Sequence, residues 1–258
     1  MLVTAKPSYD TDASAYFTTA GVTSTAGRQQ VSRFVTGIKD LGLWSNMVCW
    51  PLRSSQNTGT GTTAYSLGGL GTFSGTLTNG PTWGVDGVVF DGSNDRIALA
   101  NNSFGTGSYA TSIWVFFKSN VTASRQVVLS QGDNNSGTDA FAIEAPSSGG
   151  IDQCSMAFTG GPSLGLPDTS WKSIFHGNTT LGFSGKNGGA VSQYTLNYSI
   201  NKSGTSCAIG SFGNPAGVAP FNGIISAAIR INATPTTTIN GQVYSLYKST
   251  LGQGLGLP

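Results

Sequence analysis

Carboxylate side chains are the first candidates for chemistry in this sequence, because two of them placed together can hydrolyse a glycosidic bond. A retaining hydrolase needs a nucleophile and a general acid about 5–5.5 Å apart. The sequence contains a single glutamate, Glu144, in the segment AFAIEAPSS, and no acidic residue lies two or four positions after it. We therefore interpret Glu144 as an ordinary residue at the end of a strand. We predict that the protein is not an enzyme and has no catalytic residues.

Histidine and cysteine are too few for most other kinds of catalytic or metal site. His176 is the only histidine, which excludes metal sites built from several histidines. No Gly-x-Ser-x-Gly segment accompanies it, so we expect His176 to pack within a strand or to lie on the surface. Cys49, Cys154 and Cys207 form neither a metal-binding pattern nor a disulfide framework. We expect all three to be buried and reduced.

Two loops rich in Asp and Asn contain oxygen ligands of the kind that calcium prefers. Asp91 and Asp95 flank one turn, and Asp133, Asn135 and Asp139 lie in a second loop. Calcium takes six to eight oxygen ligands, and these loops could supply some of them. Neither loop has the EF-hand order, and Asp and Asn are also common turn formers. We favour turn formation and predict no cofactor, with calcium at Asp91 and Asp95 as the alternative.

A carbohydrate site would need an exposed aromatic side chain beside polar side chains that bind sugar hydroxyls. Trp171 begins a predicted strand and is our candidate for stacking on a sugar ring. The Asp133–Asp139 loop would supply the polar partners through Asp133, Asn135 and Asp139. Trp114 lies within the predicted strand at 110–118 and Trp83 lies just before the one at 85–90, and we expect both to belong to the core.

The composition suggests a protein that packs against other proteins, and the alternative is a secreted bacterial β-protein, which often has the same composition. Charged residues make up 9% of the 258 residues and the net charge is +2, whereas ordinary soluble domains contain roughly 25% charged residues. Interface cores show the same depletion of charge. Lysine and arginine are scattered singly, so no nucleic-acid-binding patch is predicted. No apolar stretch reaches the ~18 residues of a membrane span, and no secretion signal is recognisable at the N-terminus.

Residues 1–47 are predicted to form an extension that contains a helical hairpin. Asp12 could cap a short helix that ends at Gly21, and Thr23, Ser24 or Thr25 could cap a second one. Apolar residues recur on the second helix with helical spacing. They are Val31, Phe34, Val35, Ile38, Leu41, Trp44 and Met47. We favour packing of this stripe on the protein's own sheet; the alternative is that Phe34, Ile38, Leu41 and Trp44 dock onto another protein.

Residues 48–258 are predicted to form an all-β domain, because the apolar spacing changes toward a period of two. Short apolar or alternating runs are separated by clusters of Gly, Pro, Asn and Ser, which is typical of an antiparallel sandwich. The runs lie at residues 48–50, 71–77, 85–90, 96–99, 110–118, 126–130, 140–145, 153–158, 171–176, 190–200, 206–212 and 224–231. A short helix over residues 238–248 and a loose tail over 252–258 follow. Asp91 to Asn94 predicts a β-hairpin between two of the strands.

Three segments of the sandwich resemble concanavalin A-like (laminin G-like) jelly-roll domains. Residues 83–99, WGVDGVVFDGSNDRIAL, are similar to the family's "nG-v-FDGsnD-i-l" signature. Residues 110–117 (ATSIWVFF) and 220–231 (PFNGIISAAIRI) resemble two further strands of that family. The resemblance implies a jelly-roll sandwich. Glycan hydrolases of this fold place Glu-x-Asp-x-x-Glu on one strand, and that pattern is absent here.

The helical opening resembles the start of structural proteins of tailed phages. The resemblance rests on a Gly-Val-Thr turn, the segment QQVSRFVTGIKDLGLWSNM and Trp50-Pro51. It implies a non-enzymatic virion protein that decorates the capsid or forms part of a tail fibre or other appendage. Its partners would be other capsid or tail proteins and further copies of itself, on the virion surface after assembly in the host cytoplasm. The alternative is a carbohydrate-binding adhesin that recognises host-surface glycans.

Overall fold

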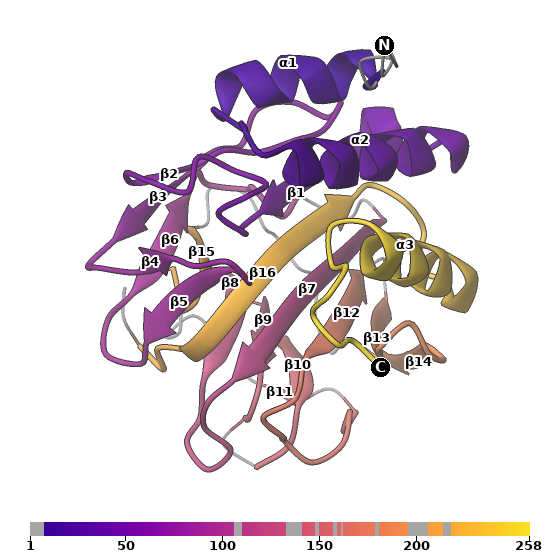
Figure 1. Ribbon diagram of the computed structural model, residues 1–258. Helices are drawn as coiled ribbons and strands as arrows, with labels where there is room; N and C mark the ends of the chain where they lie inside the picture. The colour runs from indigo at the N-terminus through magenta and orange to yellow at the C-terminus, as the bar shows by residue number, and fades with distance from the viewer. Residues whose placement is uncertain are drawn as a thin grey trace, which may run out of the picture.

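Two antiparallel sheets packed face to face form the body of the protein (Figure 1). The computed structural model describes residues 8–105, 110–132, 141–147, 150–156, 159–160, 162–178, 181–195, 206–213 and 218–258. Three α-helices accompany the sheets in this part of the chain. The all-β sandwich with an N-terminal helical hairpin and a C-terminal helix is therefore confirmed. None of the helices in these ranges is long and apolar enough to cross a membrane.

Each sheet has eight strands within the described residues. Sheet A runs β14 (Ser192–Thr195), β13 (Leu181–Lys186), β12 (Lys172–Asn178), β7 (Thr111–Ser119), β16 (Asn222–Ile231), β5 (Val88–Asp91) and β4 (Thr82–Trp83), and β1 (Met47–Pro51) also pairs with β16. Sheet B runs β11 (Thr159–Gly160), β10 (Gln153–Met156), β9 (Phe141–Glu144), β8 (Val127–Gln131), β15 (Cys207–Ile209), β6 (Arg96–Leu99), β3 (Gly75–Thr78) and β2 (Thr63–Ala64). The predicted strands at 96–99 and 110–118 match β6 and β7 closely, whereas β13 and the short strands β2, β4 and β11 were not predicted.

The central strands of sheet A, β7 and β16, are buried on both faces. On β7, Ile113, Val115 and Phe117 belong to the core between the two sheets. The intervening Trp114 and Phe116 belong to a second core on the opposite face, beneath the helices. This alternation follows from the period of two along a strand. Burial on both faces explains why this strand reads as a continuous apolar run.

The helices cover the outer face of sheet A. The helix α1 (Thr11–Thr19) contacts α2 (Thr25–Asp40), and both share the second core with α3 (Thr237–Ser249). In Figure 1, α3 lies in front of the strands and α2 lies across the top of the sheet. Tyr247 of α3 stacks on Phe116 with ring centroids 3.6 Å apart. Trp114 donates a hydrogen bond from Nε1 to Asn240 Oδ1 of α3 at 2.9 Å. The helical layer is thus an integral part of the hydrophobic core.

Three local predictions need correction. The apolar stripe predicted for the second helix runs to Met47, but α2 ends at Asp40, Trp44 lies in a separate 3₁₀ helix and Met47 opens β1. The N-cap of α1 is Asp10 and not Asp12, because the Asp10 carboxylate accepts hydrogen bonds from the backbone N–H groups of residues 12 and 13. Ser24, one of the three predicted candidates, caps α2. The C-terminal tail is packed rather than loose, since Leu255 and Leu257 are buried in the core beneath the helices.

The predicted hairpin at Asp91 to Asn94 is wrong. The strand β5 pairs with β16 and β4 in sheet A, whereas β6 pairs with β15 and β3 in sheet B. The turn therefore carries the chain from one sheet to the other. Phe90 on β5 and Ile97 on β6 both point into the core between the sheets. Turn residues indicate that the chain reverses direction. They do not indicate whether the two flanking strands pair within one sheet or face each other across a core.

Candidate functional site

A groove of about 340 Å³ lies where α1, the short 3₁₀ helix η1 (Trp44–Asn46) and the segment 65–74 meet. We call it the α1–Trp44 groove. Its lining residues are Asp12, Ala15, Tyr16, Thr19, Trp44, Tyr65, Ser66, Leu67, Gly68, Thr72 and Ser74. The volume falls within the range of small-ligand sites. The groove therefore combines aromatic rings, several hydroxyl groups and one carboxylate in a space of suitable size.

Backbone hydrogen bonds hold the wall made by residues 65–74 against the rest of the fold. Leu67 and Cys49 exchange two hydrogen bonds of 2.7 Å, and the N–H of Gly69 donates to the carbonyl of Trp44 at 3.1 Å. Gly68 has φ +149°, and a Cβ there would lie 2.0 Å from the carbonyl oxygen of Met47. Only glycine permits so close an approach. The groove is thus formed before any ligand arrives.

The hydroxyl groups of Ser66 and Ser74 are oriented by this wall. Ser66 Oγ accepts a hydrogen bond from the N–H of Phe73 at 2.8 Å, and Ser74 Oγ accepts one from the N–H of Ser66 at 3.2 Å. A hydroxyl that accepts from the backbone keeps its own proton to donate. Both serines can therefore donate hydrogen bonds to a ligand in the groove.

Charged groups occupy one rim of the groove. Lys39 Nζ lies 2.8 Å from Asp10 Oδ2 and 2.6 Å from Asp12 Oδ2, and 5.3 Å from the centre of the Trp44 ring. Hydrogen bonds to Asp10 and Asp12 raise the pKa of Lys39. Burial acts to raise the pKa of Asp10, but hydrogen bonds from Lys39 and the backbone outweigh it, so that pKa lies below its ordinary value. Of these groups only Asp12 lines the groove; Lys39 links it to Asp10, and the three together form a charged rim of two carboxylates and one ammonium group.

The four residues predicted for docking have different environments. Phe34 and Ile38 are completely buried in the core beneath the helices, so they offer no exposed surface to a partner. This agrees with the favoured interpretation, in which the stripe packs on the protein's own sheet. Leu41 and Trp44 are only partly buried. Trp44 packs against the same core and lines the groove, which gives it a place in a binding site that the helical spacing alone did not indicate.

Of the four predicted sugar-binding residues, Trp171 alone lies within the described residues. Trp171 is half-buried directly before β12 and packs against the core beneath the helices, outside the α1–Trp44 groove. Asp133, Asn135 and Asp139 lie outside the described residues. Tyr65, Ser66 and Ser74 were missed, because in sequence they belong to a stretch rich in Gly, Ser and Thr. The one usable signal there was Tyr65, a large aromatic residue in a segment that reads as a loop.

The calcium candidates Asp91 and Asp95 perform the turn-forming role. Asp95 Oδ2 accepts a hydrogen bond from the N–H of Asp91 at 3.0 Å, and Asp91 Oδ1 accepts one from the N–H of Ser93 at 2.7 Å. Burial, together with the nearby Asp91, raises the pKa of Asp95. Among the described residues no three His, Cys, Asp or Glu side chains are grouped so that they could hold a metal ion. Calcium binding by this pair stays a prediction.

Glu144 and His176 are both held by neighbouring side chains. Glu144 is the last residue of β9, as predicted, and it is buried with Oε1 only 2.5 Å from Arg125 Nη2. Gln153 Nε2 donates to its other oxygen at 3.2 Å. His176 lies in β12, completely buried, and its ring stacks on Phe141 with centroids 4.9 Å apart. The cysteines are buried and free, as predicted.

Comparison with known proteins identifies the type of fold but not the function. No protein family model and no curated protein matches the chain. Among solved structures, a Trypanosoma rangeli sialidase in complex with 2,3-difluoro-KDN aligns with a TM-score of 0.57 at 8% identity, over 74% of this chain and 32% of the sialidase. This chain therefore spans about one third of the sialidase that it matches. At this identity the similarity shows a common β-sandwich fold alone.

Two solved carbohydrate-associated domains align less well. Domain 4 of AbnA, a GH43 extracellular arabinanase from Geobacillus stearothermophilus in complex with arabinotriose, has a TM-score of 0.48 at 16% identity, over 78% of this chain and 87% of that domain. The Ruminococcus gnavus IT-sialidase CBM40 bound to α2,6 sialyllactose has a TM-score of 0.44 at 12% identity, over 54% and 84%. These scores are too low to carry an argument about ligands.

Proposed function

We propose that this protein is a non-enzymatic glycan-binding module that holds a saccharide in the α1–Trp44 groove. The observation that carries the proposal is the meeting of Trp44 and Tyr65 with Ser66, Thr72 and Ser74 around one space of about 340 Å³. Sugar rings present apolar C–H faces and hydroxylated edges. A site with aromatic faces and fixed polar groups meets both requirements.

The rim of the groove favours a hydroxyl-rich and uncharged saccharide. Asp12 can accept a hydrogen bond from a sugar hydroxyl, and the ammonium of Lys39 is already engaged by two carboxylates. An anionic sugar would meet the excess negative charge of this rim, where like charges repel. A neutral hexose or pentose unit is therefore the ligand class that fits.

The proposed setting is the surface of a tailed-phage particle, reached after assembly in the host cytoplasm. The resemblance of residues 21–51 to the opening of phage structural proteins supports this setting. There the module would act as an adhesin for host-surface glycans, with other virion proteins and further copies of itself as neighbours. The second candidate function is a structural one on the capsid or tail, without a glycan. The charged content of 9% favours it, because a charge-poor surface packs against protein with little desolvation of ions.

A glycan array followed by titration of the best ligand tests the proposal. Trp44→Ala should weaken binding about tenfold or more, as expected for loss of a central aromatic contact. Trp171→Ala is the matched control, because it also removes a half-buried tryptophan that packs beneath the helices but lies outside the groove. If glycan binding disappears only in Trp171→Ala, the glycan site lies at Trp171, as first expected from the sequence, and not in the α1–Trp44 groove. Absence of glycan binding, with binding to phage particles, would favour the structural function.

A further inference from the structure

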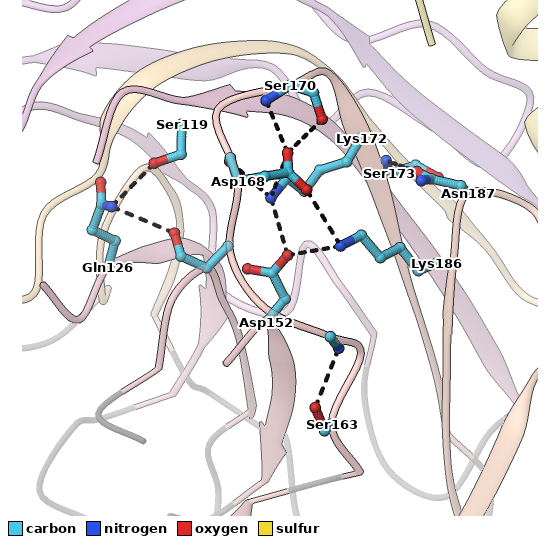
Figure 2. A network of polar contacts seen from close by, with 12 residues as sticks. Ser119, Gln126, Asp152, Ser163, Asp168, Ser170, Lys172, Ser173, Lys186 and Asn187 are labelled. Atoms are coloured by element: carbon cyan, nitrogen blue, oxygen red, sulfur yellow. Dashed lines mark hydrogen bonds and ion pairs between the residues drawn. The ribbon is translucent and has the colours of Figure 1, made fainter. Parts of the chain in front are cut away.

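A buried lysine and a buried aspartate meet at one end of the sandwich. Lys172 opens β12 in sheet A, and Asp152 directly precedes β10 in sheet B. The distance from Lys172 Nζ to Asp152 Oδ2 is 3.0 Å, and the side chains are 1% and 0% exposed. Figure 2 shows the Lys172 and Lys186 side chains converging on the same oxygen of Asp152. The pair thus bridges the two sheets within the protein interior.

The carboxylate of this pair is only partly satisfied, whereas Lys172 Nζ donates to Asp152 Oδ2 and to the carbonyl of Asp168, each at 3.0 Å. The other carboxylate oxygen, Asp152 Oδ1, is buried without a hydrogen-bond partner among the described residues. Burying a charged carboxylate with an unsatisfied oxygen is costly, and a low-dielectric interior favours neutral groups. Replacing the ion pair with a neutral link would remove that cost.

The two neighbouring charged groups are placed to move protons. Asp168 Oδ1 lies 3.4 Å from Lys172 Nζ, and Lys186 Nζ lies 3.1 Å from Asp152 Oδ2. Asp168 also accepts hydrogen bonds from the N–H and the hydroxyl of Ser170 (Figure 2). A carboxylate beside the amine can accept its proton, and an ammonium beside the carboxylate oxygen can protonate it. The cluster therefore contains a nucleophile, an acceptor carbon, a base and an acid.

The backbone holds the reacting groups in place. The N–H of Asp152 donates to the carbonyl of Gly165 at 3.0 Å, and the N–H of Leu164 donates to the carbonyl of Asp152 at 2.9 Å. Lys172 lies opposite Phe117 in the ladder between β12 and β7. Fixing two reacting groups in contact turns a slow bimolecular reaction into an efficient intramolecular one.

We propose that Lys172 and Asp152 form an intramolecular isopeptide bond that covalently joins the two sheets. Lys172 gives one proton to Asp168, and its free amine attacks Cγ of Asp152 while Lys186 donates a proton to Oδ2. The nitrogen then loses a second proton to Oδ2, the Cγ–Oδ2 bond breaks and water leaves. Asp168 finally returns its proton to Lys186. One C–N bond replaces one C–O bond, no electrons are gained or lost, and no co-reactant is needed.

Mass spectrometry of the intact, denatured full-length protein tests this inference. The expected mass is that of the sequence minus one water molecule, and a tryptic digest should contain a branched peptide that joins Asp152 to Lys172. Lys172→Gln and Asp152→Ala should each restore the full sequence mass. Asp152→Asn should still form the bond but release ammonia in place of water. Asp168→Asn and Lys186→Met should leave a larger fraction of freshly produced protein at its full sequence mass.

The Lys172→Gln variant also serves as the control for loss of water at other sites. A succinimide elsewhere in the chain would also remove water, but that loss would persist in Lys172→Gln. Wild-type protein that keeps its full sequence mass after prolonged incubation in the folded state would overturn the inference. A mass deficit that survives in Lys172→Gln, without the branched peptide, would overturn it equally.

Discussion

At the scale of single residues, surroundings decide what each side chain does. Phe34 and Trp44 belong to one apolar stripe in the sequence, yet Phe34 is completely buried and Trp44 lines a groove. Glu144 reads as an isolated acid, and the structure supplies Arg125 as its partner at 2.5 Å. In each case the residue type was informative, but the neighbour that defines its role comes from a distant part of the chain.

Asp95 gives a prediction about the pH dependence of stability. Its pKa is raised in the folded state, so ionisation costs stability as the pH rises from the ordinary value of an aspartate through the raised one. Asp95→Asn keeps an oxygen for the N–H of Asp91 but carries no charge. Urea unfolding should show the variant gaining relative to wild type between pH 4 and pH 7, by about 1 kcal/mol or less. The exposed Asp40→Asn is the control, and an equal gain there would contradict the explanation.

The thiols give a second prediction. Burial raises the pKa of all three cysteines, that of Cys207 to about 11. The reactive form of a cysteine is the thiolate, so the folded protein should resist alkylation at pH 8 and react only after denaturation. The melting temperature should not change with a mild reductant, because the cysteines are free. A clear fall in melting temperature on reduction would instead reveal a disulfide.

At the scale of elements, the helices and sheet A depend on one another. The buried face of α2 comprises Val31, Phe34, Val35 and Ile38, and it shares a core with strands β1, β7, β12 and β16. Gly27, near the start of α2, packs so closely on the carbonyl of Ser55 that a Cβ would lie 1.8 Å from its oxygen. The amphipathic spacing thus reflects packing within the chain, and the helix should not be stable without the sheet.

Shortening single side chains along the apolar stripe of α2 measures this dependence. Phe34→Ala should lower the free energy of unfolding by ~3–5 kcal/mol, because it removes a fully buried aromatic side chain. Leu41→Ala, at the partly buried end of the same stripe, is the matched control and should cost much less. Chemical denaturation of the two variants makes the comparison. Similar small losses in both would show that the predicted core beneath the helices is not formed.

At the scale of the whole molecule, the helical layer distinguishes the two faces of the sandwich. One face of sheet A is sealed by α2 and α3, and the groove lies at the edge where α1 and η1 meet the segment 65–74. With only 13 basic and 11 acidic residues, ion pairs can contribute little to any large contact surface. A contact with a neighbouring protein, such as the proposed function includes, would therefore rest mainly on uncharged surface.

A binding assay at two salt concentrations tests this property together with the proposed function. If the protein is also built into particles, recombinant protein should bind particles that lack it equally well at 0.1 M and 1 M salt. Charge-driven contacts would be screened over about 3 Å at 1 M. Glycan binding through the groove should be equally insensitive to salt and should be lost in Trp44→Ala. Strong salt dependence of either interaction would contradict an uncharged contact surface.

The sequence by itself determined the fold class, most strands and all three α-helices, because these depend on local spacing and on turn residues. A continuous apolar run marked β7 close to its observed bounds, and the helical spacing marked α2, although the predicted stripe continued to Met47 and α2 ends at Asp40. Only the tertiary structure decided which strands pair, as the turn at Asp91 to Asn94 shows, since strand pairing depends on partners far away in the chain. The same holds for the α1–Trp44 groove and for Lys172 beside Asp152. Each joins segments that no local pattern connects, and packing of the complete chain alone brings them together.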